Sequence, residues 1–190
     1  MGFGSNSKLS SAVSGSSGGG YLSPSKIQSG GSSRFHILSE EPLEYFCVWG
    51  ESPDGQVKPF RFEEDPSAAD VEEAMGDTHV RRMNREGTGP EAIKPEMSFV
   101  VWEYEAQTAK ICTFSQKGLI RELLSIASME DYQNLEDFDF TLGKEGSGLT
   151  TEYSLRAVPV KKDLDRKAAL KEASKIKLEA LLSGDNPFQS

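Results

Sequence analysis

Arginine residues are concentrated in one short segment of this 190-residue sequence. Arg81, Arg82 and Arg85 lie within five positions of one another, close to Gly87 and Gly89. Guanidinium groups bind phosphate through charge-assisted hydrogen bonds, and glycines leave a loop free to follow an extended anion. The cluster therefore indicates a phosphate-binding loop, while a solvated loop with scattered charges is the alternative interpretation.

A second group of candidates lies on segments that read as strands. Phe60 and Phe62 share one face of an extended pattern; if both rings are core, Arg61 points toward a ligand, and Lys58 is a further cation beside it. Aromatic side chains on strands either pack in the core or offer flat faces on which planar rings such as bases stack. Three aromatic residues pose this choice: Trp49, Trp102 and Tyr104.

Composition separates the chain into a tail and a domain. Residues 1–33 contain 8 Gly and 12 Ser, too few apolar side chains to offset the cost of ordering, which predicts a disordered tail. No segment approaches the roughly 20 apolar residues of a membrane span, and the tail has no secretory apolar run. We therefore expect a soluble, intracellular protein. The net charge of −9 argues against a duplex-DNA binder that relies on a basic surface alone.

Cysteine and histidine are sparse and scattered. Cys47 and Cys112 lie in apolar strand-like runs, which predicts buried free thiols. A zinc site would have to recruit both cysteines, His36 and His79 from four distant places without any short ligand pair. No metal and no other cofactor is expected.

The elements that must position these residues are mostly short strands. Residues 34–38, 43–49 and 57–62 read as strands, and Pro59 assigns the third to an edge or near its own start. Residues 63–96 read as a long inserted loop with a short helix from 67 to 75. A central strand at 97–104 then forms a hairpin with 109–114.

One helix and a last hairpin complete the expected domain. Ser115 is the expected N-cap of a helix that ends near Met129. Phe138, Phe140 and Leu142 alternate with Asp137, Asp139 and Thr141 before the Gly146–Gly148 turn, which predicts one buried and one solvated face, with both aspartates on the solvated one. Short antiparallel strands around one helix suit a small barrel, because closure removes exposed edges. Residues 161–190 are expected to form a solvated C-terminal helix and tail.

Four runs in this order resemble bacteriophage single-stranded-DNA-binding proteins of the OB-fold type: "RFHIL" at 34–38, "KPEMSFVVW" at 94–102, "TFSQKGLI" at 113–120 and "DFTLGKEGSGLTTEY" at 139–153. The resemblance covers residues 34–160 and implies an OB-fold-like barrel that coats single-stranded DNA during phage replication or recombination in the cytoplasm of the infected cell. Members with a zinc module carry cysteine and histidine ligands in the central insertion, where this chain has only His79. Many members recruit replication proteins through an acidic, aromatic-tipped tail, which "SGDNPFQS" matches only in Asp185 and Phe188.

Single-strand binding needs cations for the phosphates and aromatic faces for the bases. The expected contacts are Trp49, Lys58, Arg61, Arg81, Arg82, Arg85, Trp102 and Tyr104. An enzyme is not expected, because the sequence has no P-loop, nucleophile elbow or dinucleotide-binding fingerprint. The competing interpretation is a protein-interaction or virion-assembly module that does not bind nucleic acid.

Overall fold

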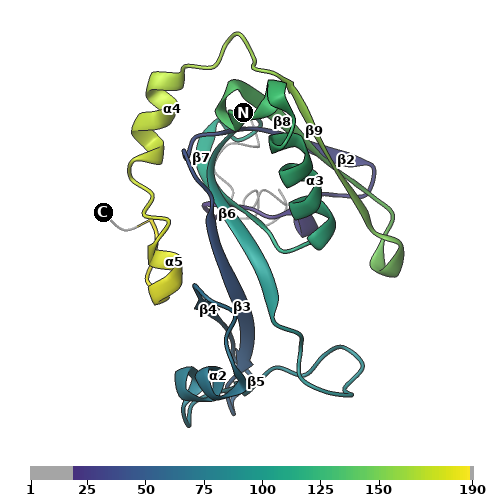
Figure 1. Cartoon of the computed structure of the whole chain (residues 1–190), viewed down its shortest axis with the longest axis vertical. Helices are drawn as coiled ribbons and strands as arrows, with labels where there is room; N and C mark the ends of the chain where they lie inside the picture. The colour runs from purple at the N-terminus through teal and green to yellow at the C-terminus, as the bar shows by residue number, and fades with distance from the viewer. Residues whose placement is uncertain (1–18, 189–190) are drawn as a thin grey trace, which may run out of the picture.

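The computed structural model describes residues 19–188, whose strands form one mixed nine-stranded sheet (Figure 1). The main path is β1-β7-β6-β2-β8-β9, and β3, β4 and β5 extend from β6 as an arm. The strands are β1 (Tyr21–Leu22), β2 (Gly31–Ile37), β3 (Leu43–Glu51), β4 (Val57–Phe62), β5 (Val80–Arg81), β6 (Lys94–Glu103), β7 (Thr108–Phe114), β8 (Phe138–Glu145) and β9 (Glu152–Pro159). The helices are α2 (Ala68–Met75), α3 (Lys117–Ala127), α4 (Arg166–Ala173) and α5 (Ala180–Ser183). The expected mainly β class is confirmed.

The sheet is not closed into a barrel. Among the described strands β9 pairs only with β8, while the far edge of β7 pairs with β1. Helix α3 lies against both β9 and β7, where a direct pairing of the two strands would otherwise close the sheet. The chain thus covers this gap with a helix instead of a ladder of hydrogen bonds.

The expected tail boundary at residue 33 is wrong. Residues 19–33 include β1, a 3₁₀ turn at Pro24–Lys26 and the first three residues of β2. Leu22 is buried in the main core, and Ser33 donates a hydrogen bond of 3.2 Å to Glu103 Oε1. Packing of Leu22 and Ile27 on the main core and the pairing of β1 with β7 therefore order a segment whose composition predicted disorder. Residues 1–18 lie outside the described part of the chain.

The main core lies between the sheet and α3. It contains the fully buried rings Phe35, Phe99, Phe114 and Phe140, which come from four different strands. Leu119 and Leu123 of α3 complete it on the helix side. The expected N-cap of this helix is wrong by one residue, since Gln116 occupies that position and makes no side-chain cap hydrogen bond. The helix ends at Ala127, two residues before the expected end.

The arm has a small core of its own. Phe60 and Phe62 pack against the buried Val48, Val71 and Met75, so of the two alternatives left open by the sequence the phenylalanines are on the core side. The helix expected in the insertion is present as α2, and Ser67 and Asp70 form a capping box at its start. Strand β4 pairs with β3 alone, which confirms that the strand with Pro59 is an edge.

The C-terminal segment differs most from expectation. It forms two short helices that lie along β6 and β7 and beside β4, not one solvated helix (Figure 1). Ala169, Leu178 and Leu181 are buried in a second core cluster. Their irregular spacing cannot fall on one helix face, so the helix breaks and both parts reach the sheet. Within the described residues, every helix is too short or too polar to cross a bilayer.

Candidate nucleic-acid interface

The strand registers divide the candidate residues between two faces of the sheet. We call the outer face the one that carries Tyr45, Val100 and Ile111, opposite the main core. Five of the eight expected contacts belong to this face: Trp49, Arg61, Arg82, Trp102 and Tyr104. Arg82 joins them because its backbone N–H donates to Trp49 O at 2.7 Å, which continues the β3–β5 register. Residues from distant parts of the sequence are thus brought to one surface.

The first part of this surface, which we call the covered half, is the outer face of β3, β4, β6 and β7. Helices α4 and α5 lie over it (Figure 1). Trp49 and Trp102 are half-buried and pack in the cluster to which these helices contribute. Arg61 Nη1 donates to Leu181 O at 3.2 Å, and its guanidinium lies 5.6 Å from the Tyr45 ring centre. Arg61 therefore contacts the chain's own C-terminal segment, and both tryptophans pack against the core cluster that this segment completes.

Burial in the covered half shifts the ionisation of its polar groups. The pKa of Glu96 is raised, chiefly by burial, against the opposing effects of the Tyr45 hydroxyl and the Arg61 charge. Burial is also the main reason why the pKa of the Cys47 thiol is raised to about 12. It raises the pKa of Tyr45 as well. Both cysteines are buried free thiols, as expected. The covered half thus behaves as protein interior.

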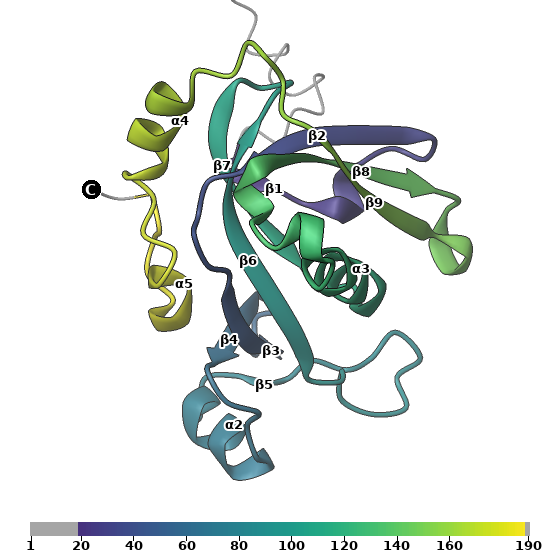
Figure 2. The same cartoon turned by 45° about the horizontal axis from the view of Figure 1, so that its top comes forward.

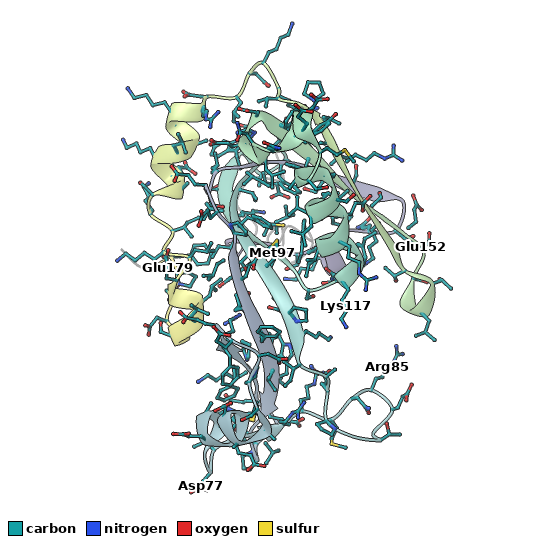
Figure 3. All side chains as sticks on the ribbon, viewed as in Figure 1. Asp77, Arg85, Met97, Lys117, Glu152 and Glu179 are labelled. Carbon is teal, nitrogen blue, oxygen red and sulfur yellow. The ribbon has the colours of Figure 1, made fainter. Side chains whose placement is uncertain are left out.

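The segment between β5 and β6, residues 82–93, which we call the arginine loop, begins beside Trp49 of the covered half and then leaves the sheet. Arg85 projects from the segment between β5 and β6, on the side of the molecule away from Glu179 (Figure 3). Arg82 and Arg85 are exposed, whereas Arg81 Nη2 donates to Glu91 O at 2.7 Å and stabilises the loop. Lys58 is exposed on the face opposite Arg61, with its Nζ 5.1 Å from the Phe60 ring centre. Within residues 19–188 the loop therefore offers two arginines without a bonded partner instead of three.

The second part of the surface, which we call the open half, is the outer face of β2, β8 and β9. None of the described α-helices lies over this side of the three strands, since α3 packs on the core side, α4 lies along β6 and β7, and α5 lies beside β4 (Figure 2). Its outer-face residues are Ser32, Arg34 and His36 on β2, Asp139, Thr141 and Gly143 on β8, and Ser154, Arg156 and Val158 on β9. All except His36 and Asp139 remain at least partly accessible.

A buried carboxylate organises this open half. Asp139, expected to be solvated, has no exposed surface. Arg34 donates from Nε to Asp139 Oδ2 at 2.8 Å, and the backbone N–H of Lys161 donates to the same oxygen at 3.1 Å. Asp139 Oδ1 accepts from the Tyr104 hydroxyl at 2.8 Å and lies 3.0 Å from His36 Nδ1. One side chain thereby connects β2, β8, the residue that follows β6 and the segment that follows β9.

Tyr104 is bound on its ring as well as through its hydroxyl. The Lys161 Nζ lies 4.7 Å from the ring centre and the Arg34 guanidinium 5.7 Å from it. Burial, followed by the hydrogen bond to Asp139 and the charge of that carboxylate, raises the pKa of Tyr104 well above its ordinary value. The tyrosine therefore holds two cations in place, a different role from the base stacking expected of it.

Sequence reasoning missed Arg34, Arg156 and Lys161 because they are scattered, with no run to mark them. A signal was nevertheless present, since Arg34 and His36 alternate with the same two-residue period as Asp139 and Thr141. Opposite charges on facing strand positions pair across a sheet. Here Arg34 stands opposite Thr141 and His36 opposite Asp139, so Asp139 is the diagonal neighbour of Arg34 and forms the ion pair with it.

The two end segments of the described chain also meet. The Phe188 ring lies edge-on to Tyr21 with centres 5.2 Å apart, next to Gly20. Phe188 is half-buried in the second core cluster. The aromatic residue of the C-terminal tail thus contacts this chain in the structure.

Comparison with family models, curated proteins and solved structures gave no match for this chain. The interpretation of the site depends on its own geometry.

Proposed function

We propose that this chain binds single-stranded DNA and catalyses no reaction. The observation that carries the proposal is the strand order: β2 pairs with both β6 and β8, and α3 stands between β7 and β8 in the chain. Five strands in this arrangement, β2, β6, β7, β8 and β9, are those expected of an OB-like barrel, here opened at the β7–β9 contact. OB folds bind oligonucleotides on the face of their second and third strands and on two flanking loops.

The charge distribution supports a single-stranded ligand. A net charge of −9 disfavours wide contact with a duplex, whereas the accessible cations of the open half and of the loop with Arg82 and Arg85 suit one flexible strand. Because a single strand bends readily, separated cationic sites can bind the same molecule. The sequence resemblance adds that such binding serves phage DNA replication or recombination in the infected cell.

A titration of labelled oligo-dT, with duplex DNA and RNA as competitors, tests the proposal. We expect a preference for the single strand and an affinity that falls as salt rises, because bound phosphates release counterions. Equal affinity for duplex DNA, or no binding to oligo-dT at low salt, would contradict it. The second of these outcomes would favour the protein-interaction or virion-assembly alternative.

A further inference from the structure

The open half retains cationic donors that the fold does not use. Arg156 is exposed and makes no hydrogen bond or ion pair with any of residues 19–188. The Lys161 ammonium contacts only the Tyr104 ring in this part of the chain. Arg34 uses Nε and Nη2, the latter donating to Pro159 O at 2.6 Å, which leaves Nη1 without a partner among the same residues.

Charge at this surface is not balanced internally. Arg34, Arg156 and Lys161 bring three positive charges, and Asp139 is the one carboxylate bonded to any of them within the described chain. Like charges held close to one another repel, so the arrangement is most stable when an anion from outside is bound. Phosphate suits it, because guanidinium and ammonium groups donate several charge-assisted hydrogen bonds to its oxygens.

Strand geometry fixes how far apart these cations lie. Arg34 stands opposite Thr141, and Thr141 stands opposite Arg156, all on the outer face. Neighbouring strands are about 4.8 Å apart, so the two arginine backbones are separated by about 10 Å across β8. Long side chains at that separation can contact successive phosphates of one strand.

Acidic residues limit the path at the other end. Glu145 and Glu152 face each other at the tip of the β8–β9 hairpin, both exposed and on the outer face. A phosphate backbone running along the hairpin would approach both carboxylates. A path that crosses β2, β8 and β9 near Tyr104 avoids them.

We propose that single-stranded DNA crosses the open half, with Lys161, Arg156 and the free Nη1 of Arg34 binding its phosphates. Tyr104 and Asp139 are positioning residues, because their side chains hold Arg34 and the segment at Lys161 in place. The inference rests on the proposed function and deepens it. The ligand is assigned to the open half because α4 lies against β6 and β7 and α5 lies against β4, so the C-terminal helices occupy the covered half.

The main test is the double variant Arg156→Ala/Lys161→Ala in the full chain, against oligo-dT. The salt slope is the steepness with which the logarithm of the binding constant falls as the logarithm of the salt concentration rises. Each phosphate that is no longer bound lowers this slope by about 0.7. For two lost contacts we expect a slope lower by about 1.4 and an affinity about 25-fold weaker at 0.1 M salt. The matched control is Lys117→Ala/Arg121→Ala, which removes the same charge from the exposed side of α3, across β9 from the open half. Its slope should stay near that of the original protein. Equal effects of the two double variants, or no effect of either, would overturn the proposal.

The positioning role of Tyr104 has its own test. Tyr104→Phe keeps the ring that holds the two cations, whereas Tyr104→Leu removes it. We expect the salt slope to fall for Tyr104→Leu and to be preserved by Tyr104→Phe, even where both variants lose thermal stability through the missing hydroxyl. Equal slopes for the two variants would remove the tyrosine from the assignment.

The outcomes separate the two proposals. If the original protein does not bind oligo-dT, the proposed function and this inference both fail. If it binds and the open-half double variant keeps its slope and affinity, only the inference fails.

Discussion

The covered and open halves are parts of one sheet face, yet they place similar residues in different states. In the covered half, Arg61 donates to a backbone carbonyl of α5 and both tryptophans pack under the C-terminal segment. In the open half, Arg34 is fixed by a buried aspartate and Arg156 has no partner among the described residues. A basic or aromatic residue on a strand is therefore a binding candidate only when no distant segment of its own chain covers it.

The two halves also differ in what stabilises them. Apolar contacts with Leu178 and Leu181 stabilise the covered half, whereas hydrogen bonds and one ion pair to Asp139 organise the open half. Removal of one charged group from a buried polar network leaves its partners unpaired and lowers stability, whereas a cluster of apolar side chains loses stability mainly when a side chain is shortened. The halves should consequently respond to different substitutions.

The largest effect is expected from Asp139→Asn. Removal of the charge leaves Arg34 and its neighbours without the carboxylate they surround, which should lower the free energy of unfolding by about 3–5 kcal/mol. Urea unfolding measures the change. The control is Asp137→Asn, an exposed position two residues away, which should stay within about 0.5 kcal/mol. A tolerated Asp139→Asn change would mean that the network does not organise the open half.

A smaller loss is expected from Leu181→Ala in the covered half. This side chain is 3% exposed, and its truncation should cost about 2–3 kcal/mol, at the low end for leucine because a short helix can relax into the space. Leu170→Ala on α4 is the control, since that leucine is 43% exposed. Acrylamide quenching of tryptophan should also rise for Leu181→Ala alone. Equal stability of the two variants would mean that α5 adds little to the covering of the sheet.

The arginine loop should affect binding more than folding. Arg82→Ala/Arg85→Ala is expected to flatten the salt dependence of oligo-dT binding by about 0.7 for each phosphate that the loop no longer binds, with an unchanged melting temperature. Arg81→Ala should instead lower thermal stability, because that side chain bonds Glu91. If the double variant keeps its affinity and its slope, the loop is not part of the binding surface.

A weaker, pH-dependent effect is expected from Glu96→Gln. The pKa of Glu96 in the folded protein lies above the ordinary 4.5, so ionisation of this group opposes folding. This loss of stability is absent at a pH below the pKa of Glu96 in the unfolded chain, and it is complete at a pH above the pKa of Glu96 in the folded protein. The variant should therefore gain stability relative to the original protein as pH rises from about 4 to 7. Urea unfolding across that range measures it, and Glu44→Gln, exposed on β3, should show no such trend.

The smallest effect is expected in tryptophan emission during an oligo-dT titration. The chain has two tryptophans, and both lie in the covered half. Binding at the open half should leave their emission without a saturable change. Saturable quenching by oligo-dT would place bases on Trp49 or Trp102 and require α4 and α5 to move.

Local patterns predicted most of the sheet. β-Branched and aromatic runs, alternation and turn residues located β2, β3, β4, β6, β7 and the last hairpin, since these signals are local to each segment. The closure of the barrel could not be predicted, because it depends on whether β7 meets β9 or α3. The position of residues 19–33 was missed for a similar reason: β1 is ordered by β7, which lies far along the chain.

The candidate site was predicted in part. The alternation of Phe60, Arg61 and Phe62 correctly placed Arg61 on the face opposite the small core. Exposure of Trp49, Trp102 and Arg61 could not be read from their own segments, because residues of the distant C-terminal segment cover them. The burial of Asp139 could not be predicted either. Its place in the alternating pattern indicates a solvated side chain, whereas the groups that bury it come from β2 and from the segment after β9.

The two-residue strand β1 matters for solubility as well as for folding. Its backbone pairs with Ile111 and Cys112 on the free edge of β7, where unpaired N–H and C=O groups could otherwise bond to the same edge of another molecule. Cutting the chain at Arg34 would remove this cover together with Leu22. The shortened protein would then expose an unpaired strand edge. We expect it to aggregate at high concentration through edge-to-edge pairing, whatever its affinity for DNA.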